Sequence, residues 1–284
     1  MALLITADDA GASVEVNESI RRSCTEGHVN SVAFLVNLPD YVDAVERVAP
    51  CVTERSLHVN LVEGRPLALA ADSPLLDGEG WFRFQGSTLL SAYYRSSSST
   101  RARISADIRT EVAAQLQAFA ETFPAPVAVD SHQHTHMFPF VLPQVLAAAK
   151  DLGLPISRLR WPTEHVSPRD ALSGGGVKAL ALTAMARRGR HHLAGSTVAT
   201  TTHAFCGVVH TGHMTVDVAR GFLDRIAGMP SGELAELLLH PGGGEHVTQA
   251  WARTPALREF YTSPWRRREL TVASAPELAP STGS

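Results

Sequence analysis

Short apolar runs alternate with amphipathic helical patterns along most of the chain. The runs predict strands at residues 2–6, 31–36, 57–61, 127–129, 158–161 and 236–239. Apolar positions at helical spacing, with caps such as Ser105 and Gly27, predict helices at residues 17–26, 41–48, 105–123, 141–151 and 215–227. Strands that alternate with helices are typical of βα units, so the pattern predicts one α/β domain with a largely parallel sheet or barrel.

The pattern is weak in a few segments. Residues 64–99 are irregular, and the polar, Ser-rich residues 91–103 are expected to be mobile. We place the domain at residues 1–272 and expect residues 273–284, rich in Ala, Pro, Ser and Thr, to form a flexible tail. Two triple glycines, Gly174-Gly175-Gly176 and Gly242-Gly243-Gly244, predict loops and lack the flanking residues of a phosphate loop.

Charge and composition narrow the class of partner. The 284 residues carry a net charge of −3, which favours neither nucleic acid nor an acidic membrane surface, so a small neutral ligand fits better. Cys24, Cys51 and Cys206 are too few and too scattered for a disulfide framework or a zinc ribbon. The amino-terminal run resembles no signal peptide and no segment is long enough to span a membrane, which predicts a cytoplasmic protein.

Titratable residues gather where the predicted strands end. Asp8 and Asp9 follow the first strand, a group of histidines follows residues 127–129, and His240 follows residues 236–239. Because the carboxyl ends of the strands of an α/β barrel meet at one mouth, these side chains are expected to share one site.

The carboxylate pair Asp8-Asp9 and the histidines suit a metal site. One acid could bind a metal while the other takes a proton from water; the alternative is that both cap the next helix. At extended spacing, His132, His134 and His136 would project to the same side, with His132 as ligand and the others orienting it or touching substrate.

The remaining candidates have simpler alternatives. His58 could be an interior histidine, and His240, held by Pro241, suits a general acid but could merely pack against its turn. A solvated basic face is predicted at His191-His192, and a surface helix turn at Arg266-Arg267-Arg268. Three further histidines could line the site or cover it: His203, His210 and His213.

Four ordered motifs resemble those of the YdjC/ChbG family of carbohydrate deacetylases, with its ChbG-like and HpnK-like members. They are Thr6-Ala7-Asp8-Asp9-Ala10-Gly11, Leu57-His58-Val59-Asn60-Leu61 with Glu63-Gly64-Arg65-Pro66-Leu67, Asp130-Ser131-His132-Gln133-His134-Thr135-His136, and Leu239-His240-Pro241-Gly242.

The chain departs from the family pattern at two places. Ala10 replaces the usual Phe beside the metal site, and family members commonly continue through another strand after the position of Leu278, which bears on barrel closure.

The resemblance implies a distorted TIM-like barrel and suggests a homodimer. It implies a divalent ion held by Asp9, His58 and His132, with Asp8 as base and His240 as acid. Arg160 matches a family arginine near the site, and we group it with His134 and His136 as expected substrate-binding residues.

The implied reaction is removal of the N-acetyl group from an N-acetylated sugar, with release of acetate. Mixed oxygen and nitrogen ligation fits Zn, Co, Ni, Mn or Mg, and the resemblance favours Mg or Zn. The substrate is expected to be chito-oligosaccharide-like, or an intermediate of glycolipid or natural-product synthesis. The alternatives are a metal-dependent hydrolase of a phosphoester or another amide, and a non-catalytic metal-dependent sugar-binding protein.

Overall fold

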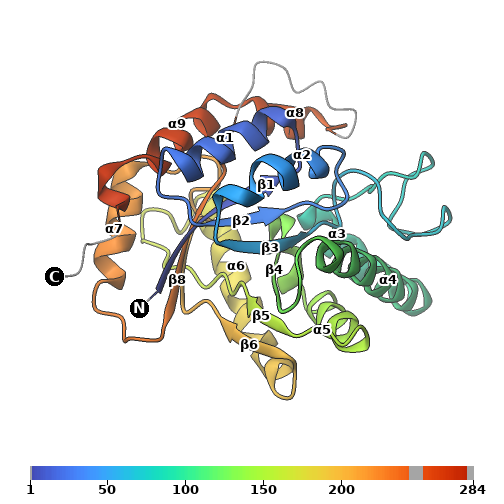
Figure 1. The fold of residues 1–284 in the computed structure, drawn as a ribbon. Helices are drawn as coiled ribbons and strands as arrows, with labels where there is room; N and C mark the ends of the chain where they lie inside the picture. The colour runs from blue at the N-terminus through green and yellow to red at the C-terminus, as the bar shows by residue number, and fades with distance from the viewer. Residues whose placement is uncertain (1, 243–251, 280–284) are drawn as a thin grey trace.

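The computed structural model describes residues 2–242 and 252–279 and has one curled parallel sheet at its centre (Figure 1). Its strands are β1 (Ala2–Ala10), β2 (Ser31–Phe34), β3 (Glu54–Val59), β4 (Val127–Ser131), β5 (Ile156–Leu159), β6 (Val198–Thr201), β7 (Ala204–Cys206) and β8 (Leu234–Leu239). They are hydrogen-bonded in the order β6-β5-β4-β3-β2-β1-β8-β7, and every ladder is parallel.

The strand order is that of an eight-stranded α/β barrel opened at one place. Read as a circle, it runs from β1 to β8 in chain order, with the break between β6 and β7. An isolated bridge between Glu164 and Phe205 lies near this seam. The expected distorted TIM-like barrel is therefore confirmed, with the site-bearing strands β1, β3, β4 and β8 away from the seam.

Helices surround the sheet, with α4 and α5 on one side and α7 on the other (Figure 1). They are α1 (Val14–Thr25), α2 (Tyr41–Arg47), α3 (Gly86–Arg95), α4 (Ser98–Thr122), α5 (Leu142–Asp151), α6 (Gly174–Gly189), α7 (Val216–Ile226), α8 (Pro255–Thr262) and α9 (Pro264–Ala273). Side-chain oxygens accept backbone N–H groups at several amino-terminal ends, as Ser13 does for α1 and Thr215 for α7. These caps define the residues at which the helices begin.

Two expectations for the middle of the chain are wrong. Residues 91–103 were expected to be mobile, but they form the end of α3 and the start of α4, where Ser97 caps α4 by accepting from the Thr100 N–H. The serines thus serve as cap and first-turn residues.

Gly174-Gly175-Gly176, which predicted a loop, forms the first turn of α6. A Cβ added to Gly175 would lie 2.1 Å from the Val209 carbonyl oxygen, and one on Gly176 would lie 1.8 Å from the Asp170 carbonyl oxygen. Gly175 and Gly176 are therefore needed for close packing of the helix start rather than for a turn.

Several elements had no sequence signal strong enough to predict them. Strand β6 is largely exposed and β7 has three residues, so neither shows an apolar run, and the sequence does not predict α3, α6, α8 or α9. The domain boundary at residue 272 stays a prediction, although Ala273 and Leu278 are buried beyond it. Gly243 and Gly244 of the second triple glycine lie outside the described residues, as do residues 280–284. Over the described part of the chain, no helix has the length and apolar character needed to cross a membrane.

Candidate active site

Strand β1 ends in an irregularity that turns two adjacent acids toward the barrel mouth. The pairing with β2 shifts register between Ala7 and Ala10, and Asp9 has φ +76°. In a regular strand neighbouring side chains point to opposite faces, whereas a bulge with a left-handed residue redirects one of them. Asp8 and Asp9 can therefore both enter the site while contacting different partners.

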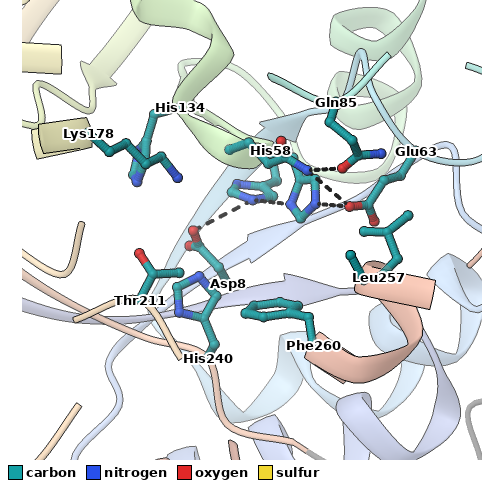
Figure 2. A pocket seen from close by; sticks show the side chains of 13 residues that line it. Asp8, His58, Glu63, Gln85, His134, Lys178, Thr211, His240, Leu257 and Phe260 are labelled. Carbon is teal, nitrogen blue, oxygen red and sulfur yellow. Dashed lines mark hydrogen bonds and ion pairs between the residues drawn. The ribbon is translucent and has the colours of Figure 1, made fainter. Parts of the chain in front are cut away.

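Asp9, His58 and His132 converge as predicted, from β1, β3 and the turn that follows β4. Asp9 Oδ1 lies 3.1 Å from His132 Nδ1 and 3.8 Å from His58 Nε2, and the two nitrogens are 3.3 Å apart. All three side chains are buried. Figure 2 shows His58 in the cavity wall near Asp8.

The outer atoms of the two imidazoles face acids. His58 Nδ1 lies 2.5 Å from Asp130 Oδ1, and His132 Nε2 lies 2.8 Å from Glu63 Oε1. If each of these outer nitrogens donates to its carboxylate, the inner nitrogens present lone pairs to one another and to Asp9. Carboxylate partners of this kind are typical around metal-binding histidines.

The three inner atoms fit a divalent ion. Tetrahedral ligands about 2.0–2.2 Å from an ion are roughly 3.3–3.6 Å apart, close to the observed separations. Asp9 Oδ1 is buried and accepts no well-directed hydrogen bond from the described residues, with His132 Nδ1 at 3.1 Å as its neighbour, so a cation bound there would satisfy it. A second group, Asp8 with His58 and Asp130, fits less well, because Asp130 bonds the His58 ring and Asp8 is held by an arginine.

Charge around these atoms changes their protonation. Burial alone would raise the pKa of Asp9, but His132 and Arg266 hold it well below its ordinary value. Burial opposes charge on His132, yet Glu63 and Asp9 outweigh it and raise its pKa to about 10. In the absence of a cation, a proton on His132 therefore balances the acids around it.

Asp8 lies beside this group and is fixed by Arg160. Arg160 Nη1 and Nη2 donate to the two oxygens of Asp8 at 2.8 and 2.9 Å, and Asp8 Oδ2 is 3.5 Å from His58 Nε2. Burial raises the pKa of Asp8, and the charges of Arg160 and His58 partly offset it. A fixed carboxylate with a raised pKa is suited to accept a proton.

His240 follows β8 on the other side of the cavity (Figure 2). Its backbone N–H donates to Glu269 of α9, and its ring lies edge-on to Phe260 with centroids 5.8 Å apart. Burial lowers the pKa of His240 to about 3, with Asp9 opposing and Arg266 adding to the shift. The ring is therefore neutral near pH 7 in the substrate-free protein.

The expectation that His132, His134 and His136 project to one side is wrong. They lie in a 3₁₀ segment, η2 (His132–Met137), in which Gln133 and His134 have φ +56° and +58°. The left-handed residues turn the chain sharply, so the three rings face different surroundings. His132 joins the candidate metal group and His134 lines the cavity, whereas His136 does not.

Two of the expected substrate-binding residues lie outside the cavity. His136 is buried between Ser131 Oγ, at 2.5 Å from Nδ1, and the Arg160 carbonyl, at 2.8 Å from Nε2. Arg160 is fully buried and forms ion pairs with three acids, Asp8, Asp130 and Glu236. Both residues position the site rather than line it.

The cavity in front of the candidate metal group has a volume of about 240 Å³. Its polar wall includes Asp8, Glu63, Gln85 and His240, and its apolar wall includes Leu257 and Phe260 of α8. Thr211 lines it, but none of His203, His210 and His213 is among the described residues that do. The space suits part of a small molecule rather than a polymer segment.

Sequence reasoning missed three residues that complete the site. Glu63 and Asp130 stand in the quoted motifs but had no role there, and their contacts with the two histidines became visible only in the structure. Arg266, expected on a surface turn, is fully buried and donates to Asp9 Oδ2 at 3.0 Å. Arg266 is buried although its neighbours Arg267 and Arg268 are exposed, a difference that a run of three arginines does not indicate.

The fold and site define a distorted α/β-barrel protein with its candidate active site at the carboxyl ends of the strands. The chain belongs to the YdjC-like protein family, whose model matches residues 2–281. It is 32% identical to a carbohydrate deacetylase of Mus musculus over 97% of this chain and 89% of that protein. It is also 33% identical to a chitooligosaccharide deacetylase of Escherichia fergusonii over 54% of this chain and 57% of that protein.

A solved structure supports the fold. A protein from Enterococcus faecalis V583, described as a candidate cellobiose-phosphate cleavage protein, superposes with a TM-score of 0.63 at 21% identity. The match covers 98% of this chain and 92% of that one.

Proposed function

We propose that this protein is a metal-dependent deacetylase that hydrolyses the acetamide of an N-acetylated sugar to acetate and a free amine. The observation that carries the proposal is the convergence of Asp9, His58 and His132 in a cavity flanked by Asp8 and His240. An Asp/His/His set leaves coordination positions open, as in catalytic rather than structural metal sites. The names of the curated relatives support the same reaction class.

Asp9, His58 and His132 would hold the divalent ion, with Mg and Zn as the leading candidates. When bound, the ion would make water more acidic and would polarise the acetamide carbonyl. Asp130 and Glu63 keep the two imidazoles in the orientation that this requires, and Arg266 holds Asp9.

Asp8 takes the proton from the attacking water. Arg160 holds both of its oxygens, so the carboxylate cannot rotate away, while burial raises its affinity for a proton. The water oxygen then forms a bond to the acetamide carbon. This role resembles that of other positioned carboxylate bases, which contribute about 10²–10⁴-fold to rate.

His240 donates a proton to the departing amine as the C–N bond breaks. Its ring is neutral before substrate binds. The negative charge of the tetrahedral intermediate raises the pKa of the ring, which then takes up a proton from solvent and passes it to the amine nitrogen. Protonation is needed because an unprotonated amide nitrogen is a poor leaving group.

The test is acetate release from N-acetylated sugars, N,N′-diacetylchitobiose among them, by protein reconstituted with Zn or Mg. Asp8→Asn is expected to reduce kcat about 10²–10⁴-fold. Asp217→Asn, an exposed acid on α7, is the matched control and should retain activity. Sugar binding that persists in Asp8→Asn and in His240→Ala, without turnover in the parent protein, would favour a non-catalytic binding protein instead.

A further inference from the structure

A second cavity, of about 360 Å³, lies between α3 and α6 beside the candidate active site. Six residues of α6 form one of its walls: Gly174, Val177, Lys178, Ala181, Leu182 and Met185. Their spacing of three and four residues places them on one face of the helix. Gly86, Ser87 and Leu90 of α3 and Phe138 line the rest. This face of α6 therefore borders open space over part of its length.

The second cavity adjoins the first, because Gln133 and Lys178 line both. Gln133 is fixed there, because its Oε1 accepts from the Gly86 N–H at 2.7 Å and its Nε2 donates to Gln85 at 2.8 Å. Lys178 reaches from α6 past His134 toward the first cavity (Figure 2). A molecule seated over the candidate metal group can thus extend past these two residues.

The lining of the second cavity is suited to hydrocarbon. Ser87, Gln133 and Lys178 supply its only polar side chains among the described residues, and two of them, Gln133 and Lys178, also line the first cavity. A sugar ring placed against this wall would find few hydrogen-bond partners, at a cost of about 1–3 kcal/mol for each hydroxyl group that it turns away from solvent. An alkyl or isoprenoid-like chain has no such groups, and the volume falls within the usual range for ligand sites, about 300–1,000 Å³.

We propose that the substrate is an N-acetylated sugar with a hydrocarbon aglycone, and that the aglycone occupies the cavity between α3 and α6. The proposal rests on the proposed function for the sugar end of the molecule. It favours a glycolipid-like substrate over a chito-oligosaccharide, because a second sugar ring would have to enter an apolar space.

The test fills the second cavity without touching the first. Ala181→Trp places a large side chain on the lining face of α6, at a position that is exposed and helical, so the fold can accept it. Ala184→Trp is the matched control, since Ala184 is an exposed alanine of the same helix that lines neither cavity.

The measurement compares methyl and hexyl N-acetyl-β-D-glucosaminides as substrates. Each buried methylene contributes roughly fourfold to binding, so the parent protein should show a KM for the hexyl glycoside at least about tenfold lower than for the methyl glycoside. Ala181→Trp should remove this preference and leave the methyl glycoside within about twofold of the parent, whereas Ala184→Trp should keep the preference. Equal KM values in the parent, or identical behaviour of the two variants, would overturn the proposal.

A binding measurement separates this proposal from the proposed function. If neither glycoside releases acetate, the deacetylase assignment fails, and calorimetric titration with hexyl β-D-glucopyranoside, which has no acetamide, still tests the cavity. Binding to the parent and to Ala184→Trp, with loss in Ala181→Trp, would support an aglycone site. Absence of binding to the parent would refute it.

Discussion

The charge of Glu63 is predicted to tighten metal binding without contacting the metal. Its Oε1 is 2.8 Å from His132 Nε2, and its Oε2 accepts from the Tyr261 hydroxyl at 3.2 Å. Glu63→Gln removes the charge but can keep both contacts, because the amide oxygen can face His132 and a tyrosine hydroxyl can either donate or accept. The variant thus isolates the electrostatic contribution.

The expected loss follows from the burial of this contact. Partners of metal-binding histidines contribute about 10–100-fold to metal affinity, and a variant that keeps the hydrogen bond should fall at the lower end, about tenfold or 1.4 kcal/mol. Solvent screening is small, because Glu63 is 2% exposed and His132 is 5% exposed. The carboxylate normally makes the imidazole a better electron donor, and a neutral amide does so less.

The assay is competition for Zn between the protein and a chromophoric chelator at fixed pH. Glu79→Gln is the matched control, since the Glu79 side chain is 69% exposed, pairs with Arg253 and does not line the cavity. Thermal unfolding without metal checks that both variants fold. An affinity of Glu63→Gln within twofold of the parent would refute the reasoning, and so would an equal loss in the control.

Three further predictions concern stability. Burial lowers the pKa of His136 from 6.5 to about 4. The free energy of unfolding of the metal-free protein should therefore fall by up to about 3 kcal/mol between pH 6.5 and pH 4, because the unfolded chain binds the proton first. His136→Gln should reduce this pH dependence, measured by urea titration at each pH. Glu111→Gln should lower the free energy of unfolding by about 1–3 kcal/mol, because Glu111 Oε2 accepts the Ala68 N–H and an amide nitrogen cannot. Glu121→Gln, at an exposed position of the same helix, should leave it unchanged. Gly176→Ala should lower the melting temperature and Gly174→Ala should not, because only the first Cβ meets a carbonyl oxygen.

The parts of the fold that the sequence predicts are those with strong local signals. Strands β1 to β5 and β8 are buried, so each shows an apolar run, whereas β6 is largely exposed and β7 is too short for a pattern. The start of α6 was misread because glycine serves close packing there, a tertiary requirement that no local rule contains.

In the candidate site too, local motifs are visible in the sequence, whereas backbone turns and contacts between distant segments are not. Asp9, His58 and His132 lie in local motifs near the carboxyl ends of strands, but the family resemblance, rather than spacing, implied them as one ligand set. The different directions of His134 and His136 depend on left-handed backbone at Gln133 and His134, which the alternating pattern conceals. Contacts between distant segments, such as Glu63 with His132, cannot be read from spacing at all.

The ion pair between Arg266 and Asp9 joins residues 257 positions apart, and it sets an order of events during synthesis. Asp9 is synthesised well before its partners: β1 can pair with β2 early, but its other neighbour, β8, and the arginine on α9 follow more than 200 residues later. Until then the buried carboxylate lacks its cation, and closing so long a loop is slow. A nascent chain without α9 is therefore expected to have the three inner ligand residues but an incomplete site.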